Sequence, residues 1–123
     1  MNRISWNQDG SEQQIEVDEA QGRVQKLQGK GSIDLTITLP DGQIVTLFMS
    51  TRRAFLMQLK APGDVGRVAT RQSHEAADWR FTLANGQEDV YPDEMTLPRD
   101  LAIAIVMALI SNRPMPDGVD WTT

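Results

Sequence analysis

Ten consecutive apolar residues, Leu101 to Ile110, constrain the fold of this chain more than any other part of its sequence. The alternation Leu101 to Ile105 would also suit a buried strand, but three alanines and the length of the run favour a helix. The run is about half the length of a membrane-spanning helix, which needs roughly 20 apolar residues. Large apolar residues cover most of its circumference, so we expect a core helix that lies across a sheet.

The ends of this helix carry recognisable signals. Pro98 suits the first helical turn, where its missing N–H has no partner to lose, and Thr96 or Leu97 precedes it as the cap. Asn112 suits the last turn, and Pro114 forces the residue before it out of helical geometry. The sequence therefore predicts a helix that begins near Pro98 and has Asn112 and Arg113 in its last turn.

Alternating apolar residues predict several strands upstream. Residues 33–39 alternate apolar with polar, Pro40 to Gln43 form a turn, and residues 45–49 return on the same pattern, which predicts a hairpin. A nearly continuous apolar segment, 54–59, predicts a third strand, and residues 68–71 a brief fourth. A second hairpin is expected around Asn85-Gly86, between the alternating residues 79–83 and the pair 90–91.

The N-terminal part predicts less regular structure. Residues 1–13 are expected to form an extended lead-in with a turn at Asp9-Gly10, followed by a short strand at 14–17. Asp18 is expected to cap an amphipathic helix from about Glu19 to Gln28. The fold class predicted is thus α+β, one domain over residues 1–123: a mostly antiparallel sheet of about five strands, with this helix and the buried C-terminal helix packed on it.

Composition limits the function. The chain has 123 residues, no cysteine and a formal charge of −5. It can therefore form no disulfide or thiolate site, and its acidity disfavours binding to a phosphate backbone. The first residues resemble no secretory signal, so we expect a cytoplasmic protein that contacts neither membrane nor nucleic acid.

The sequence contains few candidate catalytic residues. His74, the only histidine, precedes Glu75 and Asp78, and a small His-dependent enzyme built on these residues is one alternative. No nucleophile motif, phosphate-binding loop or metal-ligand spacing accompanies them, so we expect no catalytic residue, cofactor or metal. The paired Arg52 and Arg53 could clamp a phosphate or a carboxylate, but between two strands they are expected to face solvent at a turn.

The order of elements resembles a known family. A helix opened by Ile15 to Glu19, the 33–49 hairpin with its following strand, and a buried helix followed by Arg113-Pro114 and a tail ending in Trp121 are similar to immunity protein family one of bacterial polymorphic toxin systems. That family includes partners of cytidine-deaminase toxins. The resemblance implies a cytoplasmic inhibitor that occludes the active site of its toxin in a one-to-one complex, and it supplies no catalytic residues. It also implies that Trp121 anchors the tail to the domain.

An acidic segment is the predicted contact with such a toxin. A toxin that acts on nucleic acid usually presents a basic groove, and a tyrosine beside carboxylates suits an interface with it. The candidate contact residues are Glu88, Asp89, Tyr91, Asp93 and Glu94. The acidic run from Asp9 to Glu19 is the competing site, but the start of a helix explains two of its acids better. An adaptor or chaperone of a secretion system would explain the acidity and small size equally well.

Overall fold

The computed structural model describes residues 3–71 and 77–122. Its helices are α1 (Val17–Lys26), η1 (Leu27–Gly29), η2 (Asp93–Met95) and α2 (Arg99–Ser111). Its strands are β1 (Arg3–Gln8), β2 (Ser11–Glu16), β3 (Ile33–Thr38), β4 (Ile44–Met49), β5 (Arg53–Leu59), β6 (Arg67–Thr70), β7 (Asp78–Thr82), β8 (Glu88–Pro92), β9 (Leu97–Pro98) and β10 (Asp120–Thr122).

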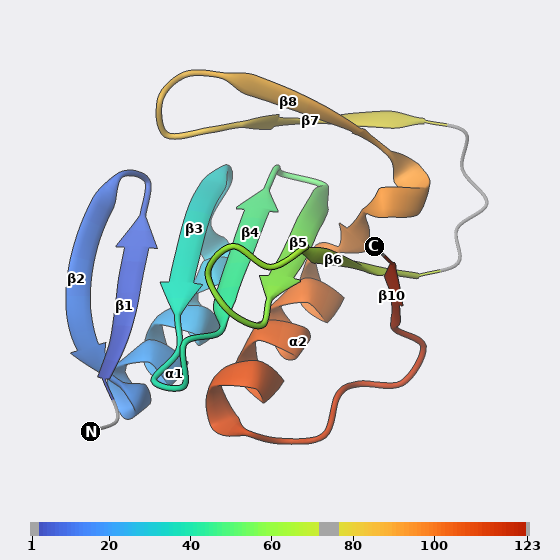
Figure 1. Cartoon of the computed structure of the whole chain (residues 1–123). Helices are drawn as coiled ribbons and strands as arrows, with labels where there is room; N and C mark the ends of the chain where they lie inside the picture. The colour runs from blue at the N-terminus through green and yellow to red at the C-terminus, as the bar shows by residue number, and fades with distance from the viewer. Residues whose placement is uncertain (1–2, 72–76, 123) are drawn as a thin grey trace.

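The strands form two sheets, and every pairing is antiparallel (Figure 1). The larger sheet has eight strands in the order β10-β6-β5-β4-β3-β1-β2, with β9 paired to β5, and β7 and β8 form a sheet of two. The predicted α+β class with a mostly antiparallel sheet is confirmed, but about five strands was too few. The strands that the sequence did not indicate are β1, which lies in the expected extended lead-in, and the short strands β9 and β10.

The N-terminal segment is a hairpin and not an extended lead-in. Asp9 and Gly10 both have positive φ, 52° and 87°, and they connect β1 to β2 in the two-residue turn that matches strand twist. The expected strand at 14–17 overlaps the second half of β2, which begins earlier, at Ser11, where no side chain before Ile15 is buried. Asp18 is not the cap of α1: Glu16 is the residue before the helix, and the Asp18 carboxylate accepts the N–H of Glu19 within the first turn.

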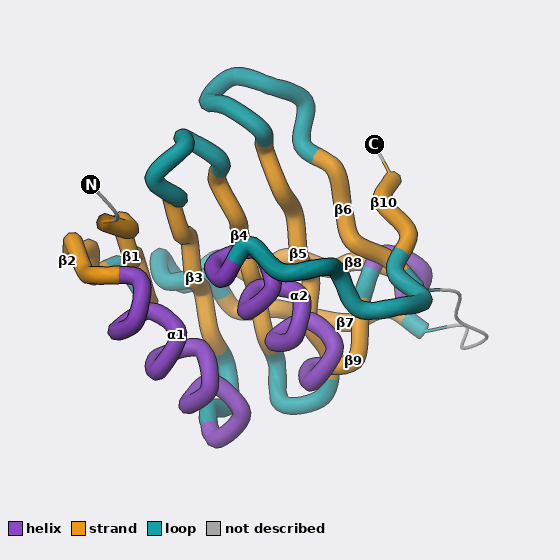
Figure 2. Tube along the Cα trace, turned by 90° about the horizontal axis from the view of Figure 1, so that it is seen from below, coloured by secondary structure: helices purple, strands orange, loops and turns teal. Residues whose placement is uncertain are grey.

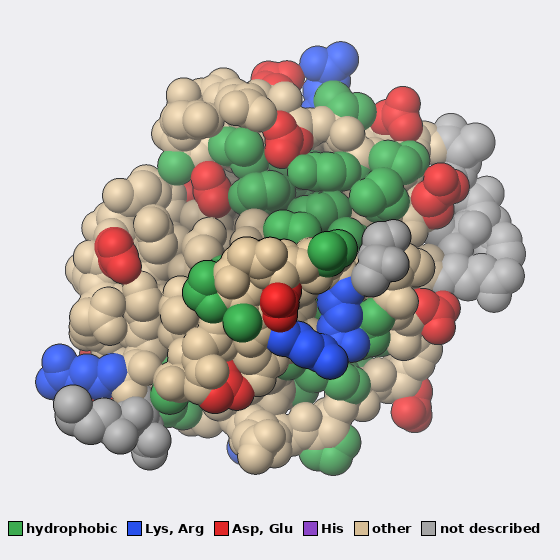
Figure 3. All heavy atoms as spheres, viewed as in Figure 1, with side chains coloured by type: hydrophobic (Ala, Val, Ile, Leu, Met, Phe, Trp, Pro, Cys, Tyr) green, Lys and Arg blue, Asp and Glu red, His purple; other side chains and the backbone are tan. Residues whose placement is uncertain are grey.

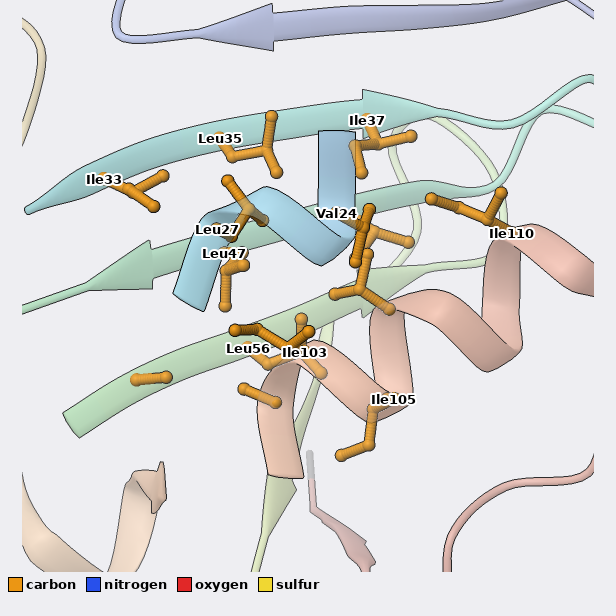
Figure 4. Packing of buried hydrophobic residues seen from close by; sticks show 14 of the residues in the cluster. Val24, Leu27, Ile33, Leu35, Ile37, Leu47, Leu56, Ile103, Ile105 and Ile110 are labelled. Atoms are coloured by element: carbon orange, nitrogen blue, oxygen red, sulfur yellow. The ribbon is translucent and has the colours of Figure 1, made fainter. Parts of the chain in front are cut away.

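The two α-helices, α1 and α2, lie side by side on one face of the large sheet (Figure 2). The residues of β3 that alternate inward, Ile33, Leu35 and Ile37, are at most 1% exposed. Figure 4 shows these side chains meeting those of the two helices, with Val24 and Ile103 among them. This layer is the main core. Along its strands every second side chain points into the core, and this alternation is the sequence pattern from which the strands were predicted.

The ends of α2 differ slightly from the prediction. Pro98 precedes the helix and, with Leu97, pairs with β5 as the short strand β9. Asn112 ends the helix in the left-handed conformation with φ of 52°, and the next N–H, of Arg113, donates to the carbonyl of Ala108 at 2.9 Å. Asparagine is among the few residues that tolerate this backbone, so Asn112 is a good helix stop.

Arg99, the first residue of α2, connects three parts of the fold. Its guanidinium donates to the carbonyl oxygen of Ser50 at the end of β4 and to that of Gly31 before β3. Further hydrogen bonds reach the carbonyls of Leu27, Gln28 and Lys30 around η1. One side chain thus satisfies carbonyls that the end of the first helix leaves without helical partners.

The β7–β8 hairpin does not belong to the large sheet, contrary to the expectation of one run of strands. It crosses one end of β3, β4 and β5 (Figure 1), and its inward side chains pack on the sheet face opposite the helices. Phe81 of β7 is 1% exposed and Phe55 of β5 is 4% exposed in this second cluster. The hairpin therefore covers part of the face that has no helix.

Candidate binding surface

A row of side chains crosses the face of the sheet that carries no helix. Asp34 of β3 lies directly opposite Phe48 of β4, and Phe48 lies opposite Phe55 of β5. Residues paired in this way point to the same face of a sheet. The two phenylalanine rings are stacked, with centroids 5.8 Å apart and planes 17° apart.

Tyr91 extends this row from the hairpin. Its ring is stacked on that of Phe55 at 4.0 Å, and it contacts Phe81 at a centroid distance of 5.9 Å. Its hydroxyl donates to the Asp89 carboxylate at 3.0 Å. Burial, together with the hydrogen bond and negative charge of Asp89, raises the pKa of Tyr91 to about 12. We call Phe48, Phe55 and Tyr91 the aromatic row.

Much of the aromatic row remains open. Phe48 and Tyr91 are half-buried, while the hairpin adds the exposed Val90 on its outer side. Figure 3 shows hydrophobic side chains gathered on this face beside the hairpin, with acidic side chains at the margin of the patch. An apolar patch bordered by charge is typical of protein-binding surfaces.

The loop between β5 and β6 borders the same face. A Cβ atom at Gly66 would lie 2.6 Å from the sulfur of Met57 and 3.5 Å from Leu59 Cδ1. Only a residue without a side chain fits this approach without a shift of Met57. The loop therefore stays close to the sheet and limits the patch on the side away from the hairpin.

A pocket of about 250 Å³ opens at the other end of the row. It lies between the β1–β2 turn, β3 and the tip of the β7–β8 hairpin, and its lining is formed by Asn7, Gly10, Asp34, Thr36, Leu83, Ala84 and Asn85. The Ala84 N–H donates to Asp34 Oδ2 at 2.8 Å, which joins the hairpin tip to the sheet. Asp34 is thus shared by the pocket and by the row.

A buried polar cluster holds the base of the hairpin. The Asp93 side chain is 2% exposed, and it accepts a hydrogen bond from Trp79 Nε1 at 2.6 Å and pairs with Arg53 at 3.5 Å. Arg53 also donates to the Thr96 hydroxyl at 3.0 Å. The guanidinium groups of Arg52 and Arg53 lie 5.0 and 5.9 Å from the centre of the Trp79 ring. Arg53 is therefore a structural residue of this cluster, contrary to the prediction that it faces solvent, whereas Arg52 is exposed.

The five predicted contact residues do not share one surface. Glu88 is exposed on the outer side of the hairpin, where it pairs with Arg80 at 3.2 Å, and Glu94 is exposed in η2. Asp89 and Tyr91 point inward, onto the row. Asp93 cannot contact a partner in this fold because it is buried, so its inclusion was wrong. Side chains along β8 point alternately toward the sheet and toward solvent. The prediction considered only how many acidic residues the segment contains, and not this alternation.

Sequence reasoning missed Asp34 and Phe48. The strict alternation of residues 33–39 already places Asp34 on the face opposite the core, but the same pattern is typical of a solvated strand face. Only the position of the β7–β8 hairpin shows that Asp34 belongs to a partly covered face and not to a solvated one. No local signal in residues 79–92 indicates where a hairpin docks, so this part of the site could not have been found from the sequence.

Trp121 lies in β10, the edge strand of the large sheet, opposite Ala69 of β6. It is half-buried, it packs against the main core, and the guanidinium of Arg67 lies 4.4 Å from the centre of its ring. Arg67 is itself fixed by two hydrogen bonds to Gln58 Oε1, at 3.0 and 2.7 Å. The tail is thus joined to the sheet by strand pairing as well as by the tryptophan.

His74 and Glu75 lie outside the described residues, and Asp78 is exposed at the start of β7. Within the described part, no group of three or more His, Asp or Glu residues could hold a metal ion. No helix of that part has the length and apolar character to span a membrane.

The sequence was also compared with known proteins. No protein-family model matches it, and no curated protein matches it.

Proposed function

We propose that this chain is a cytoplasmic immunity protein that binds and inhibits a toxin acting on nucleic acid, such as a deaminase, in a one-to-one complex. The observation that carries the proposal is the helix-free sheet face, with its half-open aromatic row beside carboxylates. An inhibitor of this kind needs a binding surface and no catalytic groups of its own. The resemblance to immunity protein family one supplies the class of partner.

Charge favours the same partner. The chain has a formal charge of −5, and a toxin groove that holds nucleic acid carries excess lysine and arginine. Attraction between opposite charges speeds association and disfavours wrong partners. An acidic protein that covers such a groove also excludes the toxin's own substrate from it.

Co-expression tests the proposal. The toxin encoded beside this gene is expressed in a sensitive bacterium with and without this chain, and we expect survival only with it. The purified chain should also abolish the toxin's activity in vitro at about one equivalent. Survival that does not depend on this chain would contradict the proposal. Binding without loss of toxin activity would instead favour an adaptor or chaperone.

A further inference from the structure

The Asp34 carboxylate has an oxygen available for a ligand. Its Oδ2 accepts the Ala84 N–H, whereas Oδ1 has no hydrogen-bond partner among residues 3–71 and 77–122. No Lys or Arg of the same residues lies within ion-pair distance of Asp34, although Asp34 is half-buried. A cation binds more strongly beside a half-buried carboxylate than beside an exposed one, because solvent screens the attraction between the two charges less.

The lining of the pocket matches a guanidinium group. Asn7, Thr36 and Asn85 add side-chain oxygens to the Asp34 carboxylate, and Leu83 adds an apolar wall. A guanidinium has five N–H donors in one plane, and its aliphatic stem packs on apolar surface. An ammonium group offers only three donors around a point charge, so it fits several spread acceptors less well.

The aromatic row lies next to this position. Phe48 is the direct cross-strand neighbour of Asp34, and its half-buried ring is stacked on Phe55. Arginine is the cation most often found over aromatic faces, where the ring attracts its charge. Asp89, at the far end of the row beside Tyr91, is a second carboxylate with no Lys or Arg within ion-pair distance in the described part of the chain.

We infer that the pocket at Asp34 receives an arginine side chain of a basic protein partner, while the aromatic row takes the apolar surface around that arginine. The identity of the partner as a toxin rests on the proposed function, but the preference of the pocket for arginine does not. Asp34 is the charge partner of the guanidinium, and Phe48 is its stacking surface. Asp89 adds long-range attraction at the other end of the row.

A small probe tests the pocket without any toxin. N-acetyl-arginine amide is titrated into the ¹⁵N-labelled protein, with the lysine and citrulline amides as comparisons, and amide shifts are followed by NMR. Citrulline has nearly the shape of arginine but no charge. We expect saturable shifts at Asn7, Asp34, Phe48 and Ala84 with arginine, weaker binding of lysine and none of citrulline. Equal shifts with citrulline, or none with arginine, would overturn the inference.

Isosteric variants identify the residues responsible. Asp34→Asn keeps an oxygen for the Ala84 N–H and removes only the charge, and we expect it to weaken arginine binding about tenfold, as the loss of a charge-assisted hydrogen bond does. Phe48→Leu keeps an apolar side chain and should weaken it about threefold through the lost cation–π contact. Asp41→Asn, in the exposed β3–β4 turn, is the matched control and should have no effect. Unchanged binding by Asp34→Asn would overturn the role of this carboxylate.

The same variants separate the two proposals in a complex. If the chain neutralises the neighbouring toxin, the double variant Asp34→Asn, Asp89→Asn should dissociate from it at least tenfold faster than the control pair Asp18→Asn, Asp41→Asn, which has the same net charge. Equal dissociation would overturn the inference and leave the proposed function standing. If no toxin is neutralised, the proposed function fails, and the arginine titration alone decides the inference.

Discussion

Asp93 offers the sharpest test of how the β7–β8 hairpin is held. An acidic residue in an acidic segment looks like a surface group in the sequence, yet its side chain is 2% exposed and accepts the indole N–H of Trp79 at 2.6 Å. The same carboxylate pairs with the guanidinium of Arg53 at 3.5 Å, and the Arg53 side chain is 17% exposed. Replacement by alanine leaves both the guanidinium and the indole N–H without this acceptor.

The structure sets the size of the effect. Removal of one member of a buried ion pair costs about 3–5 kcal/mol. Arg53 keeps its hydrogen bond to Thr96 and some contact with solvent, so we expect the lower end of that range, about 3 kcal/mol. With a urea dependence of about 2 kcal/mol per molar, the unfolding midpoint should fall by about 1.5 M.

Urea unfolding followed by circular dichroism and tryptophan fluorescence measures this shift. Asp93→Asn keeps an oxygen for Trp79 and loses only the charge, so it should fall between the wild type and Asp93→Ala. Glu94→Ala, the exposed neighbour, should change the free energy of unfolding by less than about 0.5 kcal/mol. If Asp93→Ala unfolds at the wild-type midpoint, the carboxylate does not hold the hairpin and the reasoning is refuted.

Three further predictions follow from single side chains. Arg99→Ala should lower the free energy of unfolding by about 2–4 kcal/mol, because several carbonyls lose a charged donor, whereas the exposed Arg113→Ala should have little effect in the same urea assay. Trp121→Ala should cost about 2 kcal/mol by thermal unfolding, less than the roughly 3–5 kcal/mol of a fully buried tryptophan, because its ring is half-buried. Tyr91, the only tyrosine, should ionise with a midpoint near 12 in the folded protein, by tyrosinate absorbance, against about 10 in urea. Since folding raises this pKa, the stabilisation is complete below pH 10 and is lost as the pH rises toward 12; a folded midpoint of 10 would contradict the stacking of Tyr91 on Phe55.

Apolar periodicity predicted the parts of the fold that bury one regular face. The 33–49 hairpin and the helix at 101–110 appeared because each repeats its apolar residues at the period of its own structure. The first half of β2 was not predicted because Ile15 is the only buried residue of that strand, and β9 and β10 are too short for any period. The residues of the candidate site share this difficulty: Asp34 and Phe48 meet only because strands pair in one register, and the hairpin reaches them through contacts distant in sequence.

The hairpin links the stability of the fold to the proposed binding surface, and this link determines which variants can report on binding. Tyr91 forms one end of the aromatic row, and its strand is fixed at the base by Asp93 and at the tip by the Ala84–Asp34 hydrogen bond. A replacement of Asp93 would therefore weaken arginine binding as well, by displacing the hairpin, although Asp93 never touches the ligand. Asp34→Asn should weaken binding with the unfolding midpoint unchanged, since it keeps the acceptor for Ala84. Loss of binding without loss of stability is thus the property that separates a contact residue from a residue that positions the hairpin.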